Sequence, residues 1–364
     1  MQLPPIKLDY LELMTDSTGV FQHAKYCIPK RNEGYTTDDN ARALIVCTRY
    51  HRLQDDPRTV PLANVYLAFL NHMQKPEGNF HNYLSYERVY MDVDGSEDCL
   101  GRSLWACGCT INSILPRYMK LVAKEIFDKA LPCVWKSTSL RLLAFSILGL
   151  SQYYRAYRVD DLKDSIERLA NSLCETYNDQ SKYDWRWFEP YLTYDNSRLP
   201  QALFEAYSIT RNGRYLDVAK ESTSFLLNTQ MVDGNFMPIG NNGWYKRNGK
   251  RALYDQQPLE ASAMVDTAVD AYFATHDESY LWVARTVFQW YLGKNSQKLM
   301  LYDPETAGCF DGITHNSVNM NQGAESSISY LLARLKLEEL NIRAQGGEKP
   351  RDSSTALQIN CFER

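Results

Sequence analysis

The sequence lacks the short motifs of metal-dependent, nucleotide-dependent and serine hydrolase chemistry. It contains no His-Glu-x-x-His, no Cys-x-x-Cys and no comparable spacing of metal ligands, and Cys107-Gly-Cys109 lies in an apolar stretch typical of a structural helix. No glycine-rich phosphate loop follows a predicted strand, and Gly-x-Ser-x-Gly is absent. The acidic segment 92–98 lacks the remaining ligand spacing of an EF-hand. We therefore expect no metal and no other cofactor.

Strong charge and long hydrophobic runs are also missing. The formal net charge of −4 gives no basic footprint for nucleic acid. The apolar run around Leu142 to Leu150 is far too short to cross a bilayer, and the first residues lack the layout of a signal peptide. The nine cysteines are an odd number, and several lie in apolar helical stretches, which predicts buried thiols in a reducing compartment. These features favour a cytoplasmic protein that binds neither nucleic acid nor membrane.

The most informative segment, 35–42, reads Tyr-Thr-Thr-Asp-Asp-Asn-Ala-Arg. Either threonine can cap a helix whose first turn carries Asp38 and Asp39, and negative charge suits that end of the helix dipole. Apolar residues then follow at helical spacing, so a polar helix start leads into a buried shaft. Arg42 falls on the same face as the two aspartates.

Similar polar helix starts recur along the chain, each with acids, amides or arginine before an apolar, small-residue stretch. The others begin at Ser96, Tyr194, Asp255 and Met320. Helices of this first kind are expected at about 38–51, 98–112, 137–154, 195–210, 257–275 and 322–340. Amphipathic helices of a second kind alternate with them, at about 59–74, 116–130, 160–177, 214–230 and 278–293.

A second repeat follows most helices of the second kind. It pairs glycine or an acid with an aromatic residue, as in Pro76-Glu-Gly-Asn-Phe and Val232-Asp-Gly-Asn-Phe. Glycine supplies a turn and the aromatic ring anchors the loop. Repetition at this scale predicts six helical hairpins closed into a ring, with the first kind of helix inside. The run from Leu8 to Met14 would stand in for the sixth outer helix, so the ring would close through the N-terminus.

This helix order resembles the six-hairpin (α/α)6 toroids typical of many glycoside hydrolases and some sugar epimerases. The resemblance covers roughly residues 8–340 and rests on helix number and loop placement. The Tyr-Thr-Thr-Asp-Asp-Asn-Ala-Arg-Ala-Leu segment is also similar to one in bacterial carbohydrate-active proteins, some of them associated with glycosyltransferases. The resemblance implies a sugar-sized cleft at one end of the ring, lined by inner-helix N-termini and long loops. It assigns no role to any residue.

Candidate catalytic residues follow from the chemistry of glycoside hydrolysis, which needs one protonated and one ionised carboxyl group flanking the bond. Asp39 and Asp98 open neighbouring inner helices and are followed within four residues by arginine, so they are our first candidates. Asp195 repeats the pattern on the fourth inner helix. Glu189 differs because aromatic residues surround it in the sequence, and apolar surroundings favour the protonated form that a general acid requires.

Other polar and aromatic side chains are expected to bind the sugar. Four rings lie in long loops, where they can stack on a sugar face or simply anchor the loop: Trp185, Trp187, Trp244 and Tyr245. Further contacts to hydroxyls, or charge pairs with the catalytic acids, are expected from Asp38, Arg42, Glu97, Arg102, Arg198, Asp255, Glu260, His315, Gln322 and Glu325.

Two other functions stay open. A sugar epimerase or isomerase would require a pair of histidines in the cleft. None of the six histidines lies in the first five polar helix starts. A non-catalytic glycan-binding domain that serves a glycosyltransferase would use the same cleft without cutting. The sequence favours a glycoside hydrolase acting on a mono- or oligosaccharide. Its fold is predicted as an all-α (α/α)6 toroid over 1–344, followed by a flexible tail at 345–364.

Overall fold

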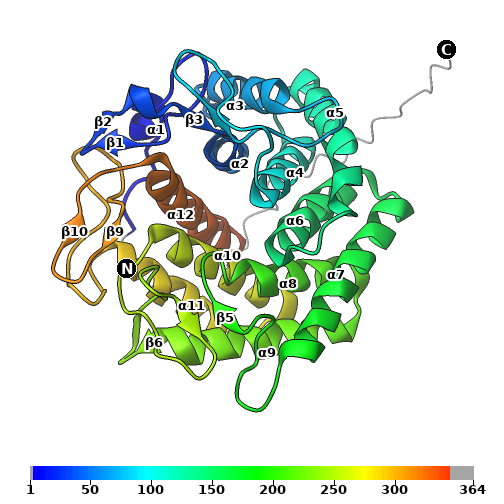
Figure 1. Cartoon of the computed structure of the whole chain (residues 1–364), viewed down its shortest axis with the longest axis vertical. Coiled ribbons are helices and arrows are strands. Elements are labelled where there is room, and N and C mark those ends of the chain that lie inside the picture. Colours follow the sequence, from blue (N-terminus) through cyan, green and yellow to red (C-terminus); the bar gives the residue numbers. More distant parts are fainter. Residues whose placement is uncertain (1–2, 345–364) are drawn as a thin grey trace.

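Six helices form an inner ring around the axis of the fold in the computed structural model, which describes residues 3–344 (Figure 1). Each inner helix packs against the next, and the last packs against the first, so the ring is closed. The predicted (α/α)6 toroid is therefore confirmed, while the predicted tail at 345–364 lies outside the described residues. The inner helices are α2 (Thr37–Gln54), α4 (Glu97–Ile111), α6 (Leu140–Tyr157), α8 (Arg198–Thr210), α10 (Pro258–Thr275) and α12 (Ala324–Ala344).

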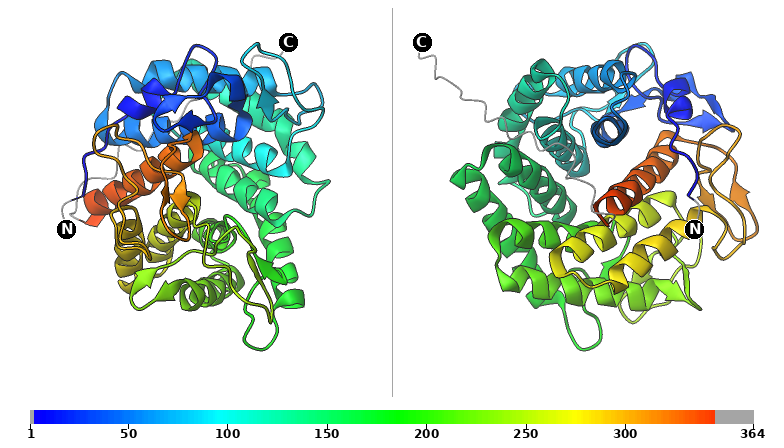
Figure 2. Two further views of the ribbon diagram at one scale, coloured as in Figure 1. Left: turned by 60° about the vertical axis from the view of Figure 1, so that its left-hand side comes forward. Right: turned by 180° about the vertical axis from the view of Figure 1, so that it is seen from behind.

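The outer wall alternates with the inner ring along the chain. It consists of α3 (Thr59–Met73), α5 (Arg117–Val134), α7 (Asp160–Gln180), α9 (Gly213–Gln230) and α11 (Ser279–Phe288), which continues into the 3-10 turn η2 (Gln289–Tyr291). The short helix α1 (Asp9–Leu13) packs against α12, as expected for a ring that closes through its N-terminus. Figure 2 shows this closure from behind, with the first and last helices side by side.

Burial explains why the inner and outer helices have different patterns of apolar and polar residues in the sequence. On α10, every residue from Pro258 to Ala271 is buried, because other helices surround it. On α7 the buried residues recur at helical spacing, as Ile166, Leu169 and Leu173 do, and the opposite face meets solvent. Small residues let the inner helices approach closely. A Cβ atom on Gly108 of α4 would lie only 2.2 Å from the carbonyl oxygen of Gly149 on α6.

Side-chain caps start α2, α4 and α6, and the first two caps lie in polar segments that the sequence singles out. The hydroxyl of Thr36 accepts a hydrogen bond from the backbone N–H of Asp39, and Ser96 and Ser139 cap α4 and α6 in the same way. The fourth inner helix was predicted from 195 but begins at Arg198. Asp195 has a φ of 49°, which lies in the left-handed region and so falls outside the helix.

The loops carry five two-stranded antiparallel ladders: β1 (Ala24–Lys25) with β2 (Ile28–Pro29), β3 (Tyr35–Thr36) with β4 (Tyr83–Leu84), β5 (Tyr191–Leu192) with β8 (Tyr245–Lys246), β6 (Met231–Val232) with β7 (Asn235–Phe236), and β9 (Gly312–Ile313) with β10 (Val318–Asn319). The predicted aromatic loops form tight turns. Phe80 pairs with Gln74 and Phe236 with Met231, and both phenylalanine rings are buried. No helix within residues 3–344 is both long and apolar enough to cross a membrane.

Candidate active site

A cavity of about 1130 Å³ opens over the N-terminal ends of the inner helices. We call it the front cavity. First-turn residues of α2, α4, α10 and α12 line it, together with Ser139, which caps α6, and Tyr194, which precedes α8. Its volume reaches the upper end of the range of ligand pockets. Polar helix starts that are far apart in the sequence therefore share one wall, as the alternation of helices predicts.

Arg102 of α4 stands at the centre of one group of carboxylates. Its Nη2 donates a hydrogen bond to Asp195 Oδ2 at 2.6 Å and lies 3.6 Å from Asp98 Oδ2. Its Nη1 lies 3.3 Å from Asp38 Oδ1. The Arg102 guanidinium is almost completely buried and faces three carboxylates from three elements. We refer to these four residues as the Arg102 cluster.

Arg42 of α2 holds a second, smaller group. Its Nη1 donates a hydrogen bond to Glu325 Oε2 at 2.8 Å, and its Nη2 lies 3.8 Å from Asp39 Oδ1. The other oxygen of Asp39 accepts a hydrogen bond from the Thr36 hydroxyl at 2.6 Å. Asp39 is thus fixed by its own helix cap and by Arg42, while the adjacent Asp38 belongs to the Arg102 cluster.

Burial gives the carboxyl groups different affinities for protons. Burial raises the pKa of Asp39 to about 6, although Arg42 opposes that rise. Burial likewise raises the pKa of Asp98 against the effect of Arg102. Burial also acts to raise the pKa of Asp195, but Arg102 and Arg198 together outweigh it, so its pKa is lowered. The front cavity therefore combines a carboxyl group that is partly protonated near neutral pH with carboxylates paired to arginine.

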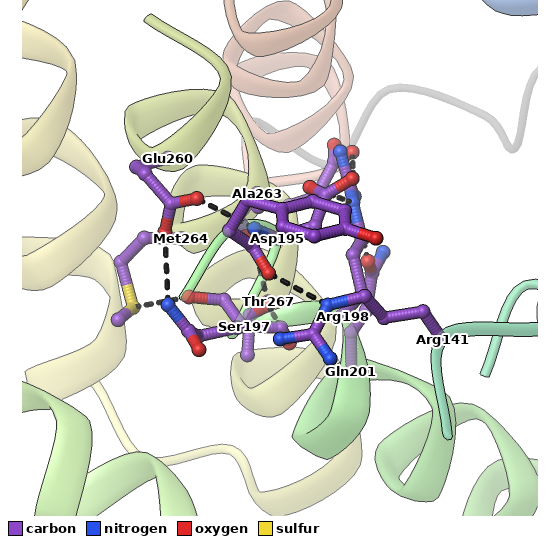
Figure 3. Close-up of polar contacts among 12 residues, drawn as sticks. Arg141, Asp195, Ser197, Arg198, Gln201, Glu260, Ala263, Met264 and Thr267 are labelled. Atoms are coloured by element: carbon purple, nitrogen blue, oxygen red, sulfur yellow. Dashed lines mark hydrogen bonds and ion pairs between the residues drawn. The ribbon is translucent and has the colours of Figure 1, made fainter. Parts of the chain in front are cut away.

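Glu260 supports this wall from behind. It is 2% exposed, and its Oε1 accepts a hydrogen bond from the backbone N–H of Asp195 at 2.5 Å (Figure 3). Its pKa is raised to about 8, first by burial and then by the charge of Asp195. Glu260 is therefore a neutral acid at pH 7 that fixes the backbone of the Arg102 cluster, and it does not line the front cavity.

Three aromatic rings border the front cavity, and one of them is the exposed ring of Tyr83. Tyr194 and Trp244 both line it, with their ring centres 6.4 Å apart. The Arg141 guanidinium lies over the Tyr194 ring, 4.7 Å from its centre. These rings are the stacking surfaces available to a sugar in this cavity. Tyr194 was not among our candidates for contact, although it opens one of the repeated polar helix starts.

Several predicted contact residues lie away from the front cavity. Trp187 is fully buried and Trp185 is 5% exposed, and both rings pack on Phe225 of α9. Tyr245 packs against Trp185. These three rings therefore anchor a loop instead of offering a face to a sugar, which is the second of the two roles that the sequence allows. The remaining predicted ring, Trp244, does line the cavity.

The predicted polar residues divide in the same way. Glu189 forms an ion pair with Arg141 at 3.1 Å instead of lining the cavity. Gln322 is buried and donates a hydrogen bond to Asp303, and His315 is exposed beside the ring of Tyr254. Asp195, Arg198 and Glu260 lie behind the wall. The predicted residues that line the front cavity are Asp38, Asp39, Arg42, Glu97, Asp98, Arg102, Trp244, Asp255 and Glu325.

Loop residues that the sequence did not single out complete the wall. They include Gln22, His23, Asn82, Asp92, Gln256 and Asp311. Asp311 is the clearest omission, because it follows Phe310 in the segment 307–312, Ala-Gly-Cys-Phe-Asp-Gly, which pairs glycine with an aromatic residue as the other repeated loops do. Burial raises the pKa of Asp311, and its Oδ1 accepts a hydrogen bond from the backbone N–H of Gly323, next to the start of α12. Within residues 3–344, no group of three or more His, Cys, Asp or Glu side chains is arranged to hold a metal ion.

Comparisons with known proteins agree on the fold. No family model matches the sequence, and no curated protein matches it. Among solved structures, a sugar epimerase from a ruminal bacterium is similar, with a TM-score of 0.71, 11% identity, and coverage of 93% of this chain and 95% of the other. The cellobiose 2-epimerase of Bacillus thermoamylovorans has a TM-score of 0.71 and 14% identity, over 92% of this chain and 96% of its own.

A glycoside hydrolase is similar over the same span. An inactive variant of an α-1,6-mannanase of family GH76 from Salegentibacter sp., in complex with α-1,6-mannotriose, has a TM-score of 0.62 and 13% identity, with 91% of this chain and 96% of the other covered. That variant carries asparagine in place of two consecutive aspartates. The chain thus has the six-hairpin (α/α)6 toroid fold that sugar epimerases and glycoside hydrolases share.

Proposed function

We propose that this protein is a glycoside hydrolase whose substrate binds in the front cavity. The observation that carries the proposal is the pair Asp38 and Asp39 at the start of α2. Asp39 has a pKa of about 6, and Asp38 forms an ion pair with Arg102. Glycoside hydrolysis requires one protonated and one ionised carboxyl group. The consecutive aspartates replaced in the inactive mannanase variant are a chemical parallel, which supports the proposal without identifying equivalent positions.

In this proposal Asp39 donates its proton to the oxygen of the scissile glycosidic bond. Asp38, as a carboxylate, attacks the anomeric carbon or takes a proton from the water that attacks it. Arg102 orients Asp38, and the Thr36 hydroxyl and Arg42 orient Asp39. Tyr194 and Trp244 would stack on the sugar faces, and Asp98, Asp255 and Glu325 would accept hydrogen bonds from its hydroxyls.

The charge of the front cavity favours a neutral glycan. Nine acidic side chains and two arginines line it, so a uronic acid or a sugar phosphate would be repelled. An epimerase with a histidine pair is less well supported, because the described wall contains one histidine, His23. A cytoplasmic location also stays a proposal. It is supported by the eight cysteines within residues 3–344, which are all free thiols.

Matched substitutions test the two roles. Replacing a proton donor by its amide commonly lowers the rate about 10²–10⁴-fold. We expect that loss for Asp39→Asn on an intact glycan, and a much smaller loss on an aryl glycoside whose leaving group needs no proton. Asp38→Asn should be slow on both substrates. The wild-type rate should fall as pH rises above about 6, because Asp39 then loses its proton.

The control is Asp233→Asn, which makes the same chemical change at an exposed turn. It should keep the wild-type kcat and KM. Equal losses for Asp39→Asn on both kinds of substrate would contradict the role of Asp39 as proton donor. Sugar binding without any cleavage by the wild type would instead favour a glycan-binding domain that works with a glycosyltransferase.

A further inference from the structure

A second cavity lies at the opposite end of the ring, over the C-terminal halves of the inner helices. We call it the rear cavity. All six inner helices contribute to its wall, through residues such as Arg49 of α2, Trp105 of α4 and Lys336 of α12. Its volume is about 200 Å³, many times the roughly 10–15 Å³ that a single water needs by the same measure. The front cavity and the proposed glycosidase chemistry make no use of it.

The rear wall carries more positive than negative side chains. Its cations are Arg49, Arg52, Arg155, Lys336 and Arg343, and its acids are Glu205, Asp270 and Glu339. Four of the cations have carboxylate partners. Arg155 pairs with Glu205 at 2.6 Å, Lys336 with Asp270 at 2.7 Å and Arg343 with Glu339 at 2.5 Å, while Arg49 pairs at 2.9 Å with Asp266, which lies behind the wall.

Arg52 is the exception. Within residues 3–344, no carboxylate lies within 4.0 Å of its guanidinium, and its Nη2 donates a hydrogen bond to the backbone carbonyl of Asn112 at 2.7 Å. Asn112 in turn donates a hydrogen bond from its side chain to Gln152 at 2.9 Å, which fixes both amides beside the arginine. A guanidinium without an ion-pair partner thus faces the rear cavity together with two oriented amides.

We propose that the rear cavity binds a small oxyanion, either inorganic phosphate or the phosphate group of a sugar phosphate. An oxyanion accepts hydrogen bonds from guanidinium and amide N–H groups at once, and it would give Arg52 the ion-pair partner that the described residues do not supply. Trp105 and Phe204 supply an apolar side to the same cavity, which suits the carbon skeleton of a sugar phosphate. The acid-rich front cavity disfavours the same ligand, so the two cavities differ in the sign of charge they accept.

Calorimetric titration of the full chain with inorganic phosphate and with glucose 6-phosphate, at constant ionic strength, tests this proposal. The wild type should bind at least one of them saturably, and binding should weaken as salt rises. Tighter binding of glucose 6-phosphate would identify a sugar phosphate as the ligand, and equal binding would identify free phosphate. Arg52→Gln should weaken binding about tenfold or more, because a charge-assisted hydrogen bond is lost.

Arg117→Gln is the matched control, since Arg117 is exposed on the outer helix α5, and this variant should bind as the wild type does. Asp38→Asn changes a residue of the front cavity that does not line the rear cavity, so it should also leave phosphate binding unchanged, whether or not the protein cleaves glycans. Gln152→Glu adds a negative charge to the rear wall and should abolish binding, which tests the site even if Arg52→Gln fails to fold. Absence of saturable binding, or wild-type affinity in folded Arg52→Gln and Gln152→Glu, would overturn the proposal.

Discussion

Adjacent residues of one helix turn can have different chemical roles, as Asp38 and Asp39 illustrate. Successive residues of an α-helix point about 100° apart, so the two carboxylates meet different partners. Asp38 lies beside Arg102, whereas Asp39 lies beside Arg42. The polar start of this helix can be predicted from capping and charge. The partner of Asp38 cannot, because Arg102 comes from the next inner helix and reaches Asp38 only through the ring.

Glu260→Gln tests the most strongly shifted acid beside the site. Glu260 keeps its proton up to about pH 8 when the chain is folded, whereas an unfolded chain loses it near pH 4.3. The unfolded state therefore binds fewer protons between these values, and stability falls as pH rises through that window. Glutamine mimics the neutral acid, so Glu260→Gln should flatten this fall and stabilise the protein at pH 8.

Urea unfolding at pH 5 and pH 8 measures the effect. The exposed Glu125→Gln on α5 serves as the matched control and should retain the wild-type dependence on pH. A Glu260→Gln protein with the full wild-type slope would show that Glu260 ionises normally in the folded chain.

At the scale of elements, helices were predictable and loop contacts were not. Inner and outer helices differ in periodicity because one kind is buried all round and the other on one face. The aromatic residues of the loops follow no such periodicity, so their contacts could not be predicted. Trp185, Trp187 and Trp244 all lie in loops between helices, yet the first two pack on Phe225 of α9 and only Trp244 lines the front cavity. The packing of Trp185 and Trp187 depends on α9, an outer helix that comes later in the chain than either ring.

The crossing of α4 and α6 supplies a prediction about stability. Gly108→Ala would place a Cβ atom 2.2 Å from the carbonyl oxygen of Gly149, so the two helices must separate. Overpacking of this kind typically costs about 1–3 kcal/mol. The control is Gly213→Ala at the start of α9, where an added Cβ has no neighbour within 4 Å and should be neutral or slightly stabilising. Equal unfolding free energies for Gly108→Ala and the wild type would contradict the close crossing.

At the scale of the whole molecule, buried charges connect the two ends of the ring. Arg102 pairs with Asp195, Asp195 lies 3.5 Å from Arg198, and Arg198 pairs with Asp266 at 2.7 Å (Figure 3 shows Asp195 and Arg198). Asp266 also pairs with Arg49 on the rear wall. The ring itself could be predicted from its repeats. This axial network could not, because its members are spread over four inner helices and one loop.

Asp266→Asn tests the contribution of the network to stability. Burial acts against the charge of Asp266, but Arg49 and Arg198 outweigh it and lower its pKa to about 2. The charge therefore stabilises the fold above about pH 4, and this stabilisation is lost as pH falls toward 2. Removing one partner from a buried ion pair costs about 3–5 kcal/mol. Thermal unfolding at pH 7 should show this loss, whereas the exposed Asp179→Asn should stay within about 0.5 kcal/mol of the wild type.

The proposed chemistry can be followed directly by proton NMR. Purified wild type and the Asp38→Asn, Asp39→Asn double variant are each incubated with a panel of neutral glycans that includes cellobiose and α-1,6-mannotriose. Anomeric signals distinguish cleavage of a glycosidic bond from epimerisation at the reducing end. A glycoside hydrolase predicts new reducing ends for at least one glycan with the wild type and none with the double variant. Epimerisation without cleavage, or cleavage that survives the double substitution, would contradict the assignment of hydrolysis to this pair of carboxylates.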